Sequence, residues 1–147
     1  MKSCYKFVIL MSTLLTVLLF TACDTSSSLY KDGMDYLSGA HDRPLDYTKA
    51  FECFKKSADM GNENAQIRVG FCYQNGTGVE QNKAEAVKWY RKAAEQGNAS
   101  AQCLLGECYC KGIGVEQDKE EGARWLHKSA QQGFEGAKYV LEEHGLE

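Results

Sequence analysis

The chain has 147 residues, a formal net charge of −3 at pH 7 and 25% charged side chains. This length leaves room for one domain once a targeting segment is subtracted. The mild acidity argues against a nucleic-acid partner, because such proteins need a basic surface to neutralise phosphates. We therefore expect no nucleic acid among the partners.

The first residues have the composition of a signal peptide. Lys2 and Lys6 give a positive start, and an apolar run follows over residues 7–20. This run of 14 residues is too short to cross a bilayer core. The pattern therefore favours a cleaved signal peptide over residues 1–22 and not a transmembrane helix.

A cysteine follows the apolar run directly. The sequence Phe20-Thr21-Ala22-Cys23 resembles the bacterial lipobox, although Phe20 replaces the leucine that is usual at its position. The resemblance implies that Cys23 is lipidated, becomes the mature N-terminus and anchors the protein in the periplasm. We expect residues 23–29 to form a flexible polar tether. An ordinary secretory signal followed by a coincidental cysteine is the alternative.

The residue after Cys23 bears on the choice of membrane. In enteric-type bacteria, Asp24 resembles the signal that retains a lipoprotein in the inner membrane. We expect the inner membrane where that signal applies and the outer membrane otherwise. Processing removes two lysines and no acid, so 15 basic and 20 acidic side chains give the mature chain a charge of −5.

From about residue 30 onward the sequence repeats itself every 36 residues. The equivalent positions include Ala65, Ala101 and Ala137, Gly70 and Gly106, Tyr73 and Tyr109, and Trp89 and Trp125. A period in this range predicts stacked two-helix units, because one helical hairpin cannot bury its apolar face without a neighbour. We therefore predict an all-α fold, a short right-handed α-solenoid of stacked helix-turn-helix units. The predicted repeat domain spans residues 30–144, with units at about 30–64, 65–100 and 101–136 and a capping helix at 137–143.

Local signals place the helix ends within the units. Gly76-Thr77-Gly78 predicts the end of a helix, because glycine adopts left-handed conformations that other residues resist. Asn82 lies three residues before Glu85, and Asp118 lies three residues before Glu121. This spacing predicts a capping box at the start of the second helix of each unit.

Two features depart from the regular repeat. The first unit has one extra residue in its turn, which also holds the only proline, Pro44. Terminal repeats are commonly atypical, so this shift is expected at an end of the stack. Gly122 replaces the alanine found at Ala86, at an expected cost of ~1 kcal/mol in helix stability.

The repeated residues resemble a known family. The motif Ala-x3-Val-Gly-x2-Tyr-x2-Gly-x-Gly-Val begins at Ala65, and the third unit repeats it with Leu105 in the place of the first valine. This motif and the sequence Trp-Tyr-x-Lys-Ala-Ala-x-Gln-Gly over residues 89–97 resemble the Sel1-like repeat. The resemblance implies an α-solenoid that binds other proteins, commonly at the bacterial envelope, and no particular chemistry. The tetratricopeptide repeat is the alternative, but its period is 34 residues and it lacks the Gly-x-Gly-Val turn.

Five cysteines remain beyond the signal peptide and Cys23. They are Cys53, Cys72, Cys103, Cys108 and Cys110. Five thiols cannot all pair, and Cys72 and Cys108 occupy equivalent apolar positions that suit small core side chains. A Cys53–Cys72 bridge stays open, because spacing alone does not establish it. No histidine lies at ligand spacing, so we expect neither a metal site nor a cofactor.

By analogy with tetratricopeptide repeats, we predict a concave groove. It is lined by the face of each unit's first helix that points away from the apolar stripe used for stacking. Its residues are Tyr30, Met34, Ile67, Phe71, Gln74, Cys103, Glu107, Cys110 and Tyr139. Ile67 and Phe71 stand at i and i+4, and exposed apolar residues rimmed by polar ones indicate a partner. The alternative is that they pack against neighbouring helices or against the tether.

No pattern of side chains supports catalysis, so we expect a protein-binding scaffold and not an enzyme. Some short Sel1-like lipoproteins are immunity proteins against phospholipase toxins delivered by type VI secretion, and the resemblance implies this role. An envelope adaptor or a stress-signalling protein is the alternative within the binding class. A peptidoglycan or β-lactam hydrolase is the alternative from another class.

Overall fold

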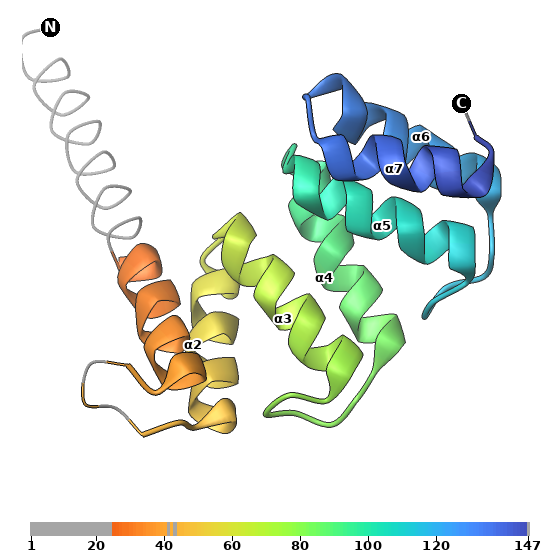
Figure 1. The fold of residues 1–147 in the computed structure, drawn as a ribbon. Helices are drawn as coiled ribbons and strands as arrows, with labels where there is room; N and C mark the ends of the chain where they lie inside the picture. Colours follow the sequence, from red (N-terminus) through yellow and green to blue (C-terminus); the bar gives the residue numbers. More distant parts are fainter. Residues whose placement is uncertain (1–24, 41, 43, 147) are drawn as a thin grey trace, which may run out of the picture.

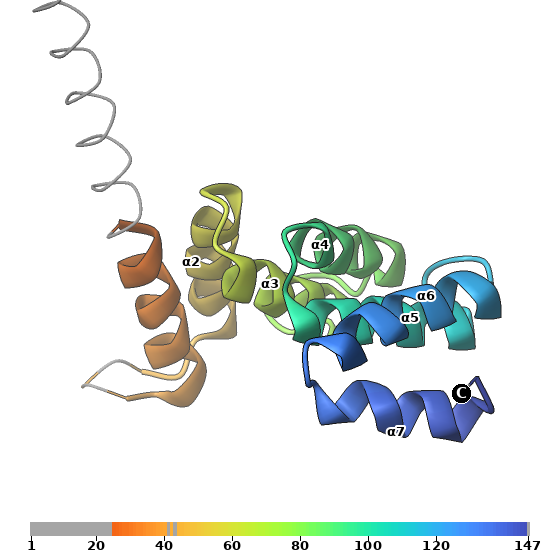
Figure 2. The ribbon, with the colours of Figure 1, turned by 90° about the horizontal axis from the view of Figure 1, so that it is seen from above.

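The computed structural model describes residues 25–40, 42 and 44–146. Every regular element within these ranges is a helix, and the helices follow one another along a single curved row (Figures 1 and 2). This arrangement confirms the predicted all-α solenoid of stacked helix-turn-helix units. The predicted signal peptide, Cys23 and Asp24 lie outside the described residues. Among the described residues, no helix has the combination of length and apolar character needed to cross a membrane.

The helix bounds follow the 36-residue period. A first helix has described residues 25–38. The others are α2 (Tyr47–Asp59), α3 (Glu63–Asn75), α4 (Lys83–Glu95), α5 (Ala99–Lys111), α6 (Lys119–Gln131) and α7 (Glu135–His144). Because α7 begins 36 residues after α5, it occupies the position of the first helix of a further unit.

Residues 25–29, which we expected in a flexible tether, belong instead to the first helix. Ser26 is buried, and its carbonyl oxygen accepts a 2.6 Å hydrogen bond from the Ser57 hydroxyl on α2. Asn62 approaches the Ser26 hydroxyl at 3.5 Å. The polar composition suggested a tether, but these tertiary partners compensate the desolvation of Ser26.

The two helices of a unit approach closely at a repeated glycine. A Cβ atom on Gly70 would lie 2.3 Å from the ring of Tyr90, and one on Gly33 would lie 2.6 Å from the ring of Phe54. Both rings are fully buried. The glycine on the first helix thus makes room for the large buried side chain on the second.

Each glycine turn packs against the unit before it. Gly76 ends α3 with a φ of 72°, which confirms the predicted helix end. A Cβ on Gly78 would lie 2.0 Å from the carbonyl oxygen of Tyr47 at the start of α2. A Cβ on Gly114 would lie 2.2 Å from the carbonyl oxygen of Lys83 at the start of α4. The second glycine of the turn is therefore required by a contact between units.

The predicted capping boxes are half correct. The Asn82 side chain accepts a 3.0 Å hydrogen bond from the Glu85 amide, as predicted. The reciprocal bond, from the backbone amide of Asn82 to the Glu85 side chain, is absent. That backbone amide donates instead to the carbonyl oxygen of Tyr73 at 2.8 Å. Glu85 instead pairs with Lys88 at 2.5 Å. The turn folds back onto α3 and so satisfies one free amide and one free helix-end carbonyl together.

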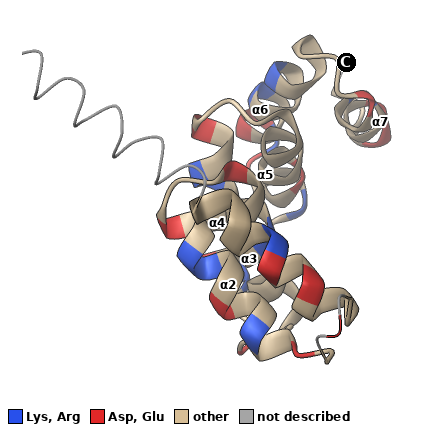
Figure 3. Ribbon diagram, turned by 90° about the vertical axis from the view of Figure 1, so that its left-hand side faces the viewer, with Lys and Arg blue, Asp and Glu red and all other residues tan. Residues whose placement is uncertain are grey.

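Charged residues of both signs are interspersed along the helices. Figure 3 shows lysine and arginine positions among aspartate and glutamate positions on α2, α3 and α4.

Candidate functional site

Three residues of the predicted groove are buried in the core. Ile67, Cys103 and Cys110 are 8%, 7% and 1% exposed. The two cysteines pack with Val140 and Leu141, so α7 covers them. The assignment of these three residues to an exposed binding face is therefore wrong. Each first helix must pack against its own partner helix and against the next unit, and this second seam uses the face that we assigned to a groove.

Two further groove residues pack within the first unit. Tyr30 and Met34 are half-buried beside Phe54, and the rings of Tyr30 and Phe54 lie 5.7 Å apart. Tyr139, by contrast, is 68% exposed on α7, at the far end of the row (Figure 1). The structure therefore does not bring the nine predicted residues together on one open surface.

One member of the predicted set lines a cleft at the surface, which we name the Phe71 cleft. It has a volume of about 290 Å³ and lies where the first helix, α2, α3 and the turn after α3 meet. Its lining residues are Leu37, Phe54, Arg68, Phe71, Cys72, Asn75 and Thr77. Sequence reasoning found Phe71 and missed the other exposed contributors. The spacing of Arg68, Phe71 and Asn75 at i, i+3 and i+7 is the signal that marks this face of α3.

The floor of the Phe71 cleft is apolar. Phe54 is fully buried, and Cys72 is nearly so. Burial raises the pKa of the Cys72 thiol to about 11, so this side chain is neutral at physiological pH. Phe71 packs edge-on against Tyr90, with ring centroids 5.7 Å apart, which fixes the wall of the cleft.

The edge of the Phe71 cleft carries a cation. Arg68 is half-buried and forms no ion pair with a carboxylate of the described residues. Its charge lies close enough to Cys72 to act against the rise of that pKa. The carbon stem of an arginine commonly packs on apolar surface while its guanidinium stays accessible, so we expect Arg68 to offer its donors beside the cleft.

The next unit has polar pairs at two of the corresponding positions. Gln74 occupies the position equivalent to Leu37 of the cleft, and its side-chain oxygen accepts a 2.9 Å hydrogen bond from the Tyr90 hydroxyl. Glu107 occupies the position equivalent to Phe71 and pairs with Lys111 at 2.7 Å. The Phe71 cleft is therefore not a general consequence of the repeat.

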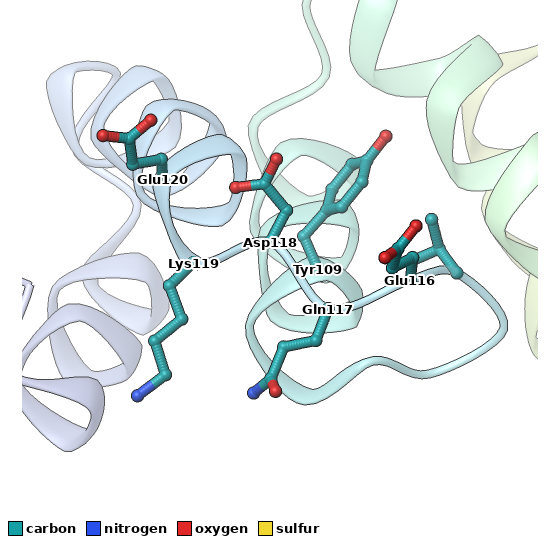
Figure 4. Close-up of a pocket in the computed structure, with 7 residues that line it drawn as sticks. Tyr109, Glu116, Gln117, Asp118, Lys119 and Glu120 are labelled. Atoms are coloured by element: carbon teal, nitrogen blue, oxygen red, sulfur yellow. The ribbon is translucent and has the colours of Figure 1, made fainter.

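A second cleft, of about 670 Å³, lies at the start of α6. Figure 4 shows the carboxylates of Asp118 and Glu120 on the same side as the Tyr109 hydroxyl, whereas Lys119 and Gln117 point away. Its polar groups already have structural roles, since Asp118 caps α6 and Gln117 donates to a carbonyl of α5. This surface corresponds to the one on which the next turn packs in the preceding unit. We therefore regard it as a stacking surface.

The cysteines do not form a reactive cluster. Cys72 is a buried free thiol, so the bridge to Cys53 that the sequence leaves open is not formed. Burial also raises the pKa values of Cys103 and Cys108 to about 11. Within the described ranges, no three cysteine, histidine or acidic side chains are grouped to hold a metal ion.

Comparison with solved structures supports the architecture. A protective antigen of uropathogenic Escherichia coli strains, which displays an SLR fold, is 41% identical, with a TM-score of 0.71. That match covers 74% of this chain and 23% of the other. A Sel1 repeat protein from Oxalobacter formigenes is 34% identical, with a TM-score of 0.73, and covers 76% of this chain and 46% of its own.

Sequence comparison identifies the repeats themselves. DAP3-binding cell death enhancer 1 of Rattus norvegicus is 45% identical over 42 residues, which are 29% of this chain and 8% of that protein. The chain thus spans less than half the length of these three relatives. The Sel1 repeat model matches residues 26–62, 64–98 and 99–134. The chain belongs to the Sel1 repeat family, whose helical repeats generally mediate binding between proteins.

Proposed function

We propose that this chain binds another protein and that the Phe71 cleft is the centre of the contact. The observation that carries this proposal is the apolar cleft itself, which is open at the surface and bordered by a cation with no carboxylate partner among the described residues. Interfaces gain most of their free energy where an anchor side chain fills such a pocket. The family membership supports binding, and we infer that the chain has no catalytic activity of its own.

We also propose that the protein is anchored in the periplasm through a lipid on Cys23. The lipobox-like sequence after an apolar run supports this anchor. Only Asp24 separates Cys23 from the described part of the first helix, so an anchored solenoid would lie close to the bilayer surface. If the retention signal applies, the inner membrane is the location; otherwise it is the outer membrane. Metabolic labelling with a fatty acid tests the anchor, and Cys23→Ala should abolish incorporation.

The finer role that we propose is that of an immunity protein against a phospholipase toxin. A protein-binding surface held at the membrane face would meet such a toxin where its substrate lies. Affinity purification of the full chain from its own envelope, with identification of the captured protein, tests this role. A phospholipase supports it, whereas an assembly or signalling protein would support the adaptor alternative.

Phe71→Asp tests the cleft. We expect at least a tenfold loss of affinity for the captured partner, about 1.4 kcal/mol, because a carboxylate cannot replace the apolar wall. Isothermal titration calorimetry measures the affinity, and circular dichroism checks that the helices remain. Tyr139→Asp is the matched control, because Tyr139 is exposed at the other end of the row.

Because Phe71 packs on Tyr90, Phe71→Asp can also disturb the fold, so a second variant tests the cleft without changing that contact. Thr77→Arg places a long side chain at the cleft edge and removes no packed ring. If both variants keep their helices and still bind like the wild type, the cleft is not the contact surface.

A further inference from the structure

We propose that the partner presents an apolar side chain beside a carboxylate, with the apolar side chain inside the Phe71 cleft and the carboxylate on Arg68. This inference rests on the proposed function and names the chemistry of the segment that binds. It follows from three features of the cleft: its size, the contacts of its cation, and lining residues that are not repeated at the next junction of the stack.

The size of the Phe71 cleft suits a side chain. Its volume of about 290 Å³ lies at the lower end of the range for small-molecule pockets, roughly 300–1,000 Å³. The floor formed by Phe54 and the neutral Cys72 offers no charged group to a ligand. An aliphatic or aromatic side chain would bury apolar surface there without leaving a polar atom unsatisfied.

Among the described residues, the cation at the edge is distinguished because its side chain has no hydrogen-bond or ion-pair partner. Of the other arginines that the structure describes, Arg91 donates to the Tyr109 hydroxyl and Arg124 pairs with Glu121 at 2.8 Å. Arg68 has no carboxylate among the described residues. A guanidinium presents its donors in a fork that matches a carboxylate, and an adjacent apolar surface strengthens the attraction.

A single carboxylate fits this edge better than a phosphate group. Arg68 is the only lysine or arginine among the seven lining residues. A phosphate carries more negative charge and is commonly held by several cations or by a helix N-terminus. The remaining polar lining residues, Asn75 and Thr77, are neutral and can hydrogen-bond the backbone of a bound segment.

Among the described residues, the combination of an apolar lining and an arginine does not recur at the next junction of the stack. In the third unit, Leu104 occupies the position equivalent to Arg68. Polar side chains that pair with each other, Gln74 with Tyr90 and Glu107 with Lys111, stand at other positions equivalent to the cleft lining. The repeat scaffold does not require an arginine at this position, so its presence beside an apolar cleft indicates recognition. The first two units therefore provide the specific contact, and the remainder of the stack supports them.

Peptide binding tests the inference on the full chain in non-ionic detergent. The probes are dye-labelled peptides of sequence Gly-Ser-Phe-Glu-Ser-Gly with an amidated C-terminus, together with one variant that has glutamine for glutamate and one that has alanine for phenylalanine. A fourth peptide, Gly-Ser-Gly-Phe with a free C-terminal carboxylate, separates a chain terminus from an acidic side chain as the source. Fluorescence anisotropy at low and high salt measures the dissociation constants.

We expect one of the two acidic peptides to bind at least fivefold more tightly than the glutamine peptide at low salt. High salt should shrink this difference, and Arg68→Gln should remove it, whereas Arg68→Lys should retain part of it. Arg124→Gln is the matched control and should leave the difference intact. The alanine peptide should bind more weakly than its phenylalanine counterpart in every variant that keeps the cleft.

Three results would overturn the inference: equal binding of acidic and glutamine peptides, a difference that survives Arg68→Gln, or no binding of the acidic peptides at millimolar concentration. Capture of the natural partner separates this failure from that of the proposed function. If Phe71→Asp abolishes capture and Arg68→Gln does not change it, the cleft binds a partner but the carboxylate is not recognised. If neither variant affects capture, both proposals fail.

Discussion

At the scale of single residues, Gly122 shows how the stack alters the meaning of a local sequence. From helix propensity alone, this glycine is expected to lower the stability of its helix by ~1 kcal/mol relative to alanine. In the structure, a Cβ at this position would lie 2.5 Å from the Cys110 sulfur and 2.9 Å from the carbonyl oxygen of Gly106. The glycine is therefore required by the close approach of α5 and α6, and the contact outweighs the propensity.

We predict that Gly122→Ala destabilises the protein by about 1 kcal/mol. Overpacking a core commonly costs roughly 1–3 kcal/mol, which exceeds the gain in helix propensity. Urea unfolding followed by circular dichroism measures the difference. Cys110→Ala combined with Gly122→Ala should recover part of the loss, because it removes the sulfur. A single variant more stable than the wild type would contradict this account.

At the scale of helices and turns, the second helix of each unit begins with the same arrangement of hydrogen bonds. An aspartate or asparagine caps the helix, and the backbone amide of this residue donates to a tyrosine carbonyl of the preceding helix. The three caps are Asp46, Asn82 and Asp118, and the three carbonyls belong to Tyr36, Tyr73 and Tyr109. The cap thus joins the two helices of a unit as well as starting the second one.

Asn82→Ala should lower the free energy of unfolding by about 1 kcal/mol, the usual effect of removing a capping side chain. The substitution removes the side chain that accepts the hydrogen bond from the Glu85 backbone amide. The hydrogen bond from the backbone amide of residue 82 to the Tyr73 carbonyl would remain. Asn82→Ser is the control, since serine caps comparably and should restore most of the stability. Equal stability of the alanine variant and the wild type in urea would show that the cap contributes nothing.

At the scale of the whole molecule, the core is a row of three clusters, and each contains a buried thiol of raised pKa. Cys72, Cys108 and Cys103 lie in successive clusters along the stack. Burial raises each pKa from an ordinary value of 9.0 to about 11, because a thiolate would be desolvated there. Well below pH 9 the thiols are protonated in both the folded and the unfolded chain, so they do not make stability depend on pH there.

Between about pH 9 and pH 11 the unfolded chain releases these protons while the folded chain holds them. The free energy of unfolding should therefore fall as the pH rises through this window, by at most about 1 kcal/mol per pH unit for each thiol. Urea titrations at several pH values measure the slope. Cys108→Ala should reduce the slope relative to the wild type, and an unchanged slope would exclude this thiol as a contributor.

The period, the glycine turns and the caps were predictable from the sequence, because they depend on residues close together in the chain. They gave the number of units, the C-terminal end of α3 and the side-chain cap at Asn82 correctly. The reciprocal half of the capping box was not predictable. It depends on how the turn folds back onto the preceding helix, which brings the Asn82 amide to Tyr73.

Only the tertiary structure decided which surfaces are open. Ile67 and Phe71 have similar local patterns, yet the third unit buries one and leaves the other at a cleft. Cys103 and Cys110 are hidden because α7 covers them, and residues 25–29 are helical because Ser26 meets α2. The sequence by itself determined a Sel1-like stack, since its signals are local and periodic. The exposure of a side chain, and the fact that no carboxylate of the described residues pairs with Arg68, depend on residues from different units, which only packing brings together.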